Sequence, residues 1–549
     1  MRDRLLSAAV VGLITALGIL PPTGTTTDSA AANSVLASQA VDRRPSIVLV
    51  VMDDFSMDLL SSMRHAETMR RTGAFYRHSY VVDSQCCPSR ASLLTGQYPH
   101  QTRVLSNSDA SLPETGPVGG FAAFRNNGNL ERSVNVQLQA SGYTTGFVGK
   151  YLNGYGGGVR PPGWSTWRAI IGDAYDGWGF RSTTVRDGVL GVREHPAPPR
   201  SASDARKDRA YAGRVANNMA LSFLRSHRDD PRPYFLEVAP YGVHSRIKPS
   251  VYRGDPLFPP AFRDRREGSC GQRSCGQLDA RDLPGFGDPQ SDNRPRYADG
   301  QTARQWRHVH DEPSANVLTR DLRNRAQMAQ SIDRMLARIL ETVDPNTYVV
   351  LTSDNGFHLG QHRLGRGKGT PFTSDVRVPL LIVGPGVRPG VRTEVVSNID
   401  LAPTFEDLAG LSRAPYRSGQ SLVPTFARPK LDRRDTTFIE HTSVASLDST
   451  GDPDVPFDSA IEKVPSYVAV RTRKALLVRF DLDRSWTGVR YAWEFYDFTH
   501  VGWERTNHYG SAKYAGLIDR LTHRMEQFDT CSSVVRDDAV PVECRSLTQ

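Results

Sequence analysis

The chain has 549 residues, 38% of them hydrophobic, and a formal net charge of +9. One hydrophobic core rarely fills so long a chain, so we expect one large domain and a smaller one. The basic residues are dispersed and form no tract interleaved with aromatic residues, which argues against nucleic acid as a partner. The charge is compatible with a polyanionic substrate.

The first residues resemble an export signal. The charged start MRDR is followed by the apolar run LLSAAVVGLITALGIL and then by a small, polar, alanine-rich stretch. The apolar run is too short and too early for a membrane span, and no later segment is long enough to cross a bilayer. We therefore expect a signal peptide over 1–32, a flexible linker over 33–43, and a secreted or extracytoplasmic protein without stable membrane insertion. An uncleaved N-terminal anchor is the alternative.

Two β-rich runs that end in polar residues predict central strands of an α/β sheet. They are PSIVLVVMDD at 45–54 and NTYVVLTSDNG at 346–356. Continuous apolar runs are typical of strands buried on both faces, and functional groups gather at the carboxyl ends of such strands. One polar pair alone would only cap a turn, but two pairs of oxygen donors favour a site for a hard cation, Ca²⁺ or Mg²⁺. The candidate ligands are Asp53, Asp54, Asp354 and Asn355.

The rest of the chain completes this pattern. Residues 323–343 carry apolar side chains at helical spacing, 378–386 is typical of a strand, and 398–410 predicts a helix that ends at Gly410. The region from about 180 to 325 is rich in Arg, Asp, Pro and Gly, and we expect long loops there, near the active face.

The predicted fold class is therefore α/β. We expect a large, mixed, mostly parallel sheet sandwiched by helices over 44–430. Beyond it, runs such as SYVAVRTRKALLVRF and WEFYDF predict antiparallel strands, and YAGLIDRLTHRMEQF predicts a late helix. These segments indicate a smaller C-terminal α+β domain over 431–549.

Six cysteines in an exported chain indicate disulfides. Two of the six, Cys86 and Cys87, are adjacent, and a disulfide between neighbours would strain the peptide between them. We therefore expect another purpose for this pair. The plausible disulfides are Cys270 with Cys275 and Cys531 with Cys544.

The stretch SQCCPSRASLLTG at 84–96 predicts a short helix that starts near Pro88 and ends at Gly96. Cys86 lies just before the helix N-terminus, where the helix dipole favours negative charge, and Arg90 lies within a turn of it. Such a place stabilises a thiolate or a developing anion. The residues by themselves therefore indicate a reactive cysteine.

The same stretch resembles the signature of the type I sulfatases, a family of the alkaline-phosphatase-like superfamily. The matching residues are C-x-P-S-R at 86–90 and LTG at 94–96. In that family a separate formylglycine-generating maturation enzyme oxidises the cysteine to an aldehyde, formylglycine. The resemblance implies this conversion at Cys86, whereas Cys87 occupies the variable position and packs.

The resemblance covers most of the chain. Its motifs are similar to those of the glucosamine-6-sulfatase and heparan endosulfatase branch. GKYLNGY places Lys150 on the family's sulfate-binding lysine, and TSDNGFHLGQHRLGRGKGTPF places Lys368 on its second lysine. PYFLEVAPYGVH puts His244 at that branch's histidine. The resemblance further implies that Arg90 anchors the nucleophile and that Cys86 joins the four oxygen donors around the cation.

The sequence departs from the family pattern at two places. No proline follows His244 where the family has one, and Leu152 stands where many sulfatases carry a histidine two residues after the first lysine. The base that releases sulfate is therefore left open. Asn153, His358 or His362 could assist.

The implied reaction is hydrolysis of a sulfate monoester to an alcohol and inorganic sulfate. Hydrated formylglycine would supply the nucleophile, and the cation would polarise a sulfate oxygen. Lys150, Lys368 and His244 would hold the other oxygens, and His244 or Lys368 would protonate the departing alcohol. The implied substrates are sulfated small molecules or glycans, such as 6-sulfated N-acetylglucosamine, or aryl sulfates.

Three other functions fit parts of the pattern. Some phosphate or phosphonate ester hydrolases of the same superfamily also carry C-x-P-x-R, although the oxygen ligand set with Asn355 favours sulfate. A non-catalytic binder of sulfated glycans would suit the basic charge but needs no nucleophile. A thiol enzyme would use Cys86 unmodified.

Overall fold

The computed structural model describes residues 44–108, 111–112, 116–172, 174–186, 188–265, 268–288, 293–306, 313–443, 464–482, 490–534 and 538–548. The predicted signal peptide and linker lie outside these residues. None of the helices in the described part of the chain is long and apolar enough to cross a membrane.

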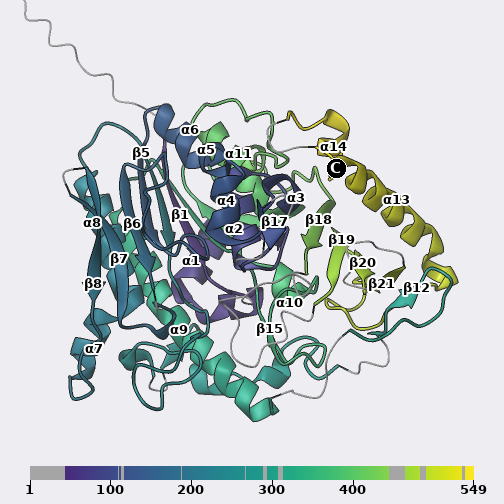
Figure 1. Ribbon diagram of the computed structural model, residues 1–549, viewed down its shortest axis with the longest axis horizontal. Coiled ribbons are helices and arrows are strands. Elements are labelled where there is room, and N and C mark those ends of the chain that lie inside the picture. The colour runs from purple at the N-terminus through teal and green to yellow at the C-terminus, as the bar shows by residue number, and fades with distance from the viewer. Residues whose placement is uncertain are drawn as a thin grey trace, which may run out of the picture. The chain divides into compact units, whose positions relative to one another are not determined.

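A ten-stranded mixed sheet forms the centre of the fold (Figure 1). Five neighbouring strands in its middle, from β13 to β6, run parallel, and the strands β16, β7 and β8 pair antiparallel. The prediction of a mixed, mostly parallel sheet is therefore confirmed. In spatial order the strands are β17 (Gly390–Ser397), β2 (Ala74–Tyr80), β16 (Leu380–Val383), β13 (Thr347–Ser353), β1 (Ser46–Met52), β9 (Tyr234–Ala239), β5 (Thr144–Gly149), β6 (Thr166–Ile171), β7 (Phe180–Arg186) and β8 (Val189–His195).

Helices cover both faces of this sheet, which explains why β1 is apolar at every position from Ile47 to Met52. Successive side chains of a strand point to opposite faces, so Val48 and Val50 enter one core and Leu49 and Val51 enter the other. The first core is closed by α1 (Arg64–Thr72), α8 (Ala212–Ser226) and α9 (Ala315–Thr342). The second is closed by α2 (Cys86–Thr95), α4 (Gly120–Asn126), α6 (Val134–Ala140) and α11 (Leu401–Leu408).

A separate antiparallel sheet follows in the C-terminal part, as predicted (Figure 1). Helix α13 (Ala515–Cys531) packs on one face of it. The short strand β12 comes from before residue 431 and pairs with β21, so the predicted boundary at 430/431 is crossed by one strand and stays a prediction. The sheet consists of β12 (Arg296–Tyr297), β21 (Tyr491–Asp497), β20 (Ala475–Asp481), β19 (Ser466–Thr472) and β18 (Thr436–His441).

The expectation of long loops from 180 to 325 is wrong for much of that region. It contains β7, β8, the helix α7 (Asp204–Ala210), α8, the central strand β9 and the first part of α9. Helix α8 buries apolar residues on one side only, and its polar side faces solvent. The charged and small residues of these exposed surfaces dominate the composition and conceal the helical period. Only short elements occur between β9 and α9.

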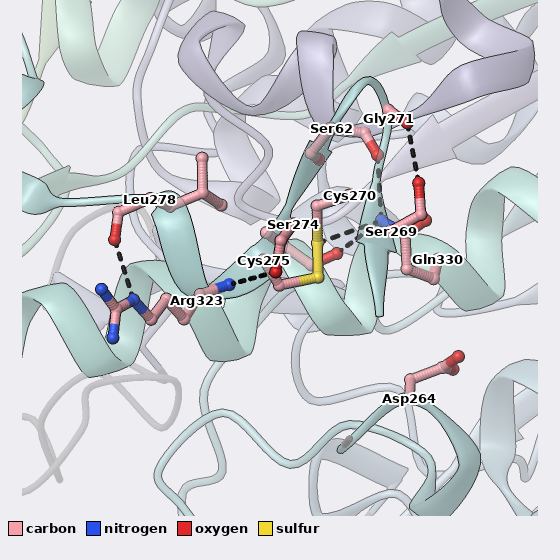
Figure 2. Close-up of a disulfide and its surroundings, with 12 residues drawn as sticks. Ser62, Asp264, Ser269, Cys270, Gly271, Ser274, Cys275, Leu278, Arg323 and Gln330 are labelled. Carbon is pink, nitrogen blue, oxygen red and sulfur yellow. Dashed lines mark hydrogen bonds between the residues drawn. A yellow bond between two sulfur atoms is a disulfide. The ribbon is translucent and has the colours of Figure 1, made fainter. Parts of the chain in front are cut away.

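Both predicted disulfides are present, Cys270 with Cys275 and Cys531 with Cys544. Figure 2 shows the first, which closes a small hairpin that lies against α9. The amide of Gln330 on α9 donates to the Ser62 carbonyl and lies 3.7 Å from the Cys270 sulfur. This side chain therefore joins α9 to one of the loops that follow β9.

Candidate active site

The parallel register of two central strands assembles the site. Met52 at the end of β1 is level with Ser353 at the end of β13, so the polar residues that follow both strands meet at one sheet edge. Strand β5 ends beside them and presents Lys150, and α2 starts there with Cys86. Cys86 is the first residue of the helix, whereas its expected place was just before the helix N-terminus. Gly96 ends the helix with φ of 66°.

Two lysines pair with the two aspartates after β1. The Lys150 Nζ atom lies 2.9 Å and 3.1 Å from the two carboxylate oxygens of Asp53. The Lys368 Nζ atom lies 2.6 Å from Asp54 Oδ1 and 2.6 Å from Cys86 Sγ. The Cys86 sulfur is itself 3.6 Å from Asp53 Oδ1. Lys368 therefore contacts the predicted nucleophile directly, whereas Lys150 pairs with Asp53, which lies beside that nucleophile.

Arg90 and Asp354 form a second layer beside this centre. The Arg90 Nε atom donates to Asp354 Oδ2 at 2.8 Å, and its Nη1 atom donates to the Lys150 carbonyl at 3.0 Å. Asp354 Oδ1 accepts from the backbone N–H groups of Asp54 and Asn355. Arg90 thus fixes the segment that carries one lysine and the turn that carries two candidate ligands.

His244 completes the centre from the loop after β9. Its Nε2 atom lies 3.5 Å from Asp54 Oδ2, and its Nδ1 atom lies 2.7 Å from the Ser245 carbonyl. Since a carbonyl only accepts, Nδ1 carries a proton and Nε2 is the nitrogen that faces the site. The structure therefore brings together all nine residues that the sequence singles out.

The buried oxygen atoms at this centre fit a hard cation. Asp54 Oδ2 and Asn355 Oδ1 are fully buried and have no hydrogen-bond partner in the described part of the chain. Ligand atoms of Asp53, Asp54, Cys86 and His244 lie within 4.8 Å of one another. Because unpartnered buried oxygens are costly unless a donor or cation satisfies them, this arrangement suits Ca²⁺ or Mg²⁺.

The two aspartates after β1 differ in the pKa of their carboxyl groups. Burial raises the pKa of the Asp53 carboxyl to about 6, against the opposing charge of Lys150. Burial also acts on Asp54, but Lys368 and His244 outweigh it and hold the pKa of that carboxyl below its usual value. The Asp54 side chain is therefore held in its carboxylate form.

Burial also raises the pKa of the Cys86 thiol well above its usual value, although Lys150 and Lys368 oppose this effect. The expectation that the helix N-terminus would stabilise a thiolate here is thus wrong for the unmodified side chain. Desolvation outweighs the favourable charges. This weakens the thiol-enzyme alternative. Cys87 packs in the second core, as expected.

Three supporting residues escaped the sequence analysis. The buried Arg325 of α9 donates to the Asp54 carbonyl, and Ser89 Oγ donates to the Asp354 carbonyl. The Tyr175 ring lies 4.5 Å from the His244 ring, and a lysine ammonium, that of Lys150, lies 5.1 Å from the same tyrosine. Arg325 leaves a signal, because it is a cation on the apolar face of a predicted helix, and Ser89 belongs to the C-x-P-S-R motif, whereas Tyr175 leaves none.

Asp54 also has an uncommon backbone. Its φ of 58° lies in the left-handed region, which non-glycine residues rarely adopt. The contacts from Arg325 and Asp354 hold both its carbonyl and its N–H group. Strain of this kind persists where surrounding contacts determine the conformation, and it is common at functional sites.

The candidate helpers for sulfate release have other partners. His358 Nδ1 lies 3.0 Å from Asp375 Oδ2, and His362 Nε2 lies 3.4 Å from Glu504 Oε2. Asn153 is buried and accepts from the Phe121 N–H through its backbone carbonyl. The side-chain contacts give the two histidines structural roles, whereas the Asn153 contact involves only its backbone, so the identity of the base stays open.

The fold and this centre define an α/β protein with a buried cluster of ligand atoms that suits a cation, beside two lysines and a helix N-terminus. Residues 45–411 match the sulfatase family, so the chain belongs to that family. It is 31% identical over 410 residues to an extracellular sulfatase SULF-1 homolog of Drosophila melanogaster, a match over 71% of this chain and 32% of that protein. It is 29% identical over 415 residues to the N-acetylglucosamine-6-sulfatase of Homo sapiens, over 71% of this chain and 66% of that one. The chain thus covers 32% of the first relative and 66% of the second, less than two thirds of either.

Solved structures support the fold. One describes a protein in complex with its substrate D-glucosamine-2-N,6-O-disulfate, with a TM-score of 0.60, 19% identity, and coverage of 89% of this chain and 98% of that chain. Another is a phosphonate monoester hydrolase from Silicibacter pomeroyi, with a TM-score of 0.61, 17% identity, and coverage of 88% and 95%. The two share the architecture described above, namely the large mixed sheet with its helices and the C-terminal antiparallel sheet.

Proposed function

We propose that the chain is a sulfuric ester hydrolase that converts a sulfate monoester to an alcohol and inorganic sulfate. The observation that carries this proposal is the position of Cys86. Its side chain lies at the start of α2, within 4 Å of Asp53, Asp54 and Lys368. Membership of the sulfatase family supports conversion of this cysteine to formylglycine by a maturation enzyme.

A hydrated formylglycine at position 86 supplies a nucleophilic hydroxyl, and a divalent cation, Ca²⁺ in our proposal, supplies Lewis acidity at a sulfate oxygen. The ligands we assign to that cation come from the turns after β1 and β13 and from the residue at position 86. They are Asp53, Asp54, Asp354, Asn355 and the side chain at position 86.

The protein's own cations bind the anionic substrate. Lys150 and Lys368 approach position 86 from β5 and from the loop before α10 (Thr373–Val376), so a sulfate group between them contacts both ammonium groups. Charge builds up on the leaving oxygen and on the sulfate as the S–O bond breaks. Fixed ammonium groups in a buried site stabilise that charge more than water does. The hydrogen bond from Arg90 to Asp354 holds α2, which carries the nucleophile, in place relative to the turn after β13.

His244 is placed to protonate the departing alcohol. Its Nδ1–H group donates to the Ser245 carbonyl, so only Nε2 faces the centre. The Nε2 atom lies 3.5 Å from Asp54 Oδ2, and from this place it would deliver a proton to the leaving oxygen. Lys368 is the second candidate for this role, because its ammonium also lies at position 86.

The proposed substrates are sulfated sugars. Relatives named N-acetylglucosamine-6-sulfatase and extracellular sulfatase match about 70% of the chain, which supports 6-sulfated N-acetylglucosamine within anionic glycans. Aryl sulfates are the simpler alternative, as relatives named arylsulfatase suggest. The extracellular sulfatase relatives and the predicted signal peptide support a secreted protein.

The test combines mass spectrometry with turnover. We expect the peptide that contains Cys86 to carry an aldehyde in protein made together with a maturation enzyme, and this protein to hydrolyse an aryl sulfate far faster than the matching aryl phosphate. Cys86→Ala, made in the same way, should lack both properties. Faster phosphate turnover would instead support the phosphonate hydrolase alternative, whose fold is shared. Unmodified cysteine without sulfate turnover would contradict the proposal.

A further inference from the structure

A second basic site lies apart from the cluster around Cys86. A cavity of about 310 Å³ lies between α7, the start of α8, the short helix η3 (Phe262–Asp264) and the middle of α9. Its charged lining is dominated by guanidinium groups, and no lysine takes part. The charged residues are Arg209, Arg214, Arg263, Arg334, Arg338 and Asp208.

The positive charge of this pocket is not balanced by the protein. Arg334 forms a two-pronged ion pair with Asp264, at 2.8 Å and 2.6 Å (Asp264 is labelled in Figure 2). The side chains of Arg214 and Arg338 make no ion pair with any described residue, and both are exposed to the pocket's solvent. Burial and then the nearby Arg338 and Arg263 lower the pKa of Arg214. Positive charges outnumber the carboxylates of Asp208 and Asp264 here, and an anion between the guanidinium groups would reduce their mutual repulsion.

A buried amide in the same pocket also lacks a partner. Asn217 is only 4% exposed, and its Oδ1 atom has no hydrogen-bond partner among the described residues. That oxygen is an acceptor, so it contributes nothing to the binding of an anion. The Ser331 side chain lines the wall as well, and its hydroxyl can donate to an anion beside the guanidinium groups.

The pocket flanks the loop that carries His244. It shares Tyr211 and Ser331 with a narrower cavity, and that cavity is lined by Tyr175 and Gly242. The Tyr175 ring contacts the His244 ring, at 4.5 Å between ring centres. Shared wall residues therefore connect the pocket to the narrow cavity beside the loop that carries His244.

We propose that the arginine pocket binds a second sulfate-type oxyanion, held by the unpaired guanidinium groups of Arg214 and Arg338. Planar guanidinium groups match the oxygens of a sulfate in two-pronged contacts, which explains the absence of lysine. The oxyanion is either a sulfo group of an anionic glycan or free sulfate. The choice of a glycan rests on the proposed function, whereas the oxyanion site itself does not.

Binding of two probes to the full chain tests this inference. All proteins carry Cys86→Ala, so the probe is not consumed, and calorimetry measures the affinity for a heparin-derived octasaccharide and for inorganic sulfate. We expect R214A/R338A to weaken octasaccharide binding about tenfold or more, because two charge-assisted contacts and the linkage between sites are lost. R214K/R338K keeps the charge but loses the fork, and should be intermediate.

The matched control is R225A/R228A, which removes the same charge from exposed positions at and just beyond the far end of α8. It should bind as the parent does, within about threefold, since surface charges act weakly at a distance. A loss confined to the octasaccharide identifies a glycan sulfo group, and a parallel loss for inorganic sulfate identifies the free ion. Equal effects of the pocket and control pairs would overturn the inference. Aryl sulfate turnover by the Cys86 enzyme tests the proposed function separately.

Discussion

The Lys368 Nζ atom lies 2.6 Å from the Sγ atom of Cys86. The same ammonium lies 2.6 Å from Asp54 Oδ1, so one charged group contacts both the proposed nucleophile and a proposed metal ligand. Both partners are buried, and Lys368 is only 1% exposed. In such surroundings a fixed charge acts more strongly than it would in water.

Lys368→Met should therefore lower kcat for an aryl sulfate about 10²- to 10³-fold, the usual cost of losing one preorganised donor at a developing anion. The measurement is steady-state turnover of the formylglycine form, with the mass of the modified peptide confirmed for each variant. Lys474→Ala, at an exposed position, is the control. A loss confined to KM would contradict a role in the transition state.

The site is largely predictable from sequence because it rests on local patterns. The pairs after β1 and β13 follow apolar runs that form central strands whatever the neighbouring segments do, and parallel register then brings Asp54 and Asn355 together. The helix that starts at Cys86 follows from its proline and glycine. Each of these features depends on a few adjacent residues.

What the sequence does not reveal depends on long-range contacts. Tyr175 reaches His244 from a turn between β6 and β7, almost 70 residues earlier in the chain, and nothing in its neighbourhood indicates that contact. The sequence of strand β16 is typical of a buried strand and does not indicate its direction. That direction, antiparallel to β13 and β2, follows from its pairing with them. Composition hides α8 in a similar way, because its exposed face is polar.

Asn355→Ala should weaken cation binding. Its Nδ2 atom donates to Asp54 Oδ1 at 2.7 Å, which leaves Oδ1 of the amide directed at no described partner. We expect Ca²⁺ to raise the melting temperature of chelator-treated protein, because the ion binds only the folded form, and the concentration for half the effect to rise about tenfold or more in the variant. Asn126→Ala, at an exposed position, should behave as the parent does. No Ca²⁺ effect on either protein would contradict the assigned cation site.

Tyr175 should act as a positioning residue for His244. Its ring packs on the imidazole and lies 5.1 Å from the Lys150 ammonium, so it constrains two proposed substrate contacts. Tyr175→Leu should lower kcat/KM about tenfold and alter the pH profile of kcat, since a displaced imidazole transfers protons less well. Tyr175→Phe keeps the ring and should stay near the parent. Equal loss in both variants would show that the hydroxyl matters instead of the ring.

Glu504 should make stability depend on pH in acid. It accepts hydrogen bonds from Thr373 at 2.6 Å and from Arg471 at 3.1 Å, and His362 Nε2 lies 3.4 Å away. Burial opposes these contacts, but they lower the pKa of the Glu504 carboxyl to about 2, from a usual value of 4.5. A depressed pKa means that the stabilisation is complete above pH 4.5 and is lost as pH falls towards 2.

The difference amounts to about 3 kcal/mol in the free energy of unfolding. Urea unfolding at pH 5, 4 and 3 should show the stability gap between the parent and Glu504→Gln shrinking as pH falls, because the amide cannot titrate. Glu526→Gln, at an exposed position on α13, should keep a constant gap. A constant gap for Glu504→Gln as well would contradict this role of the carboxylate. The segment from His362 to Thr373, which includes Lys368, would then be held against the C-terminal sheet by other contacts.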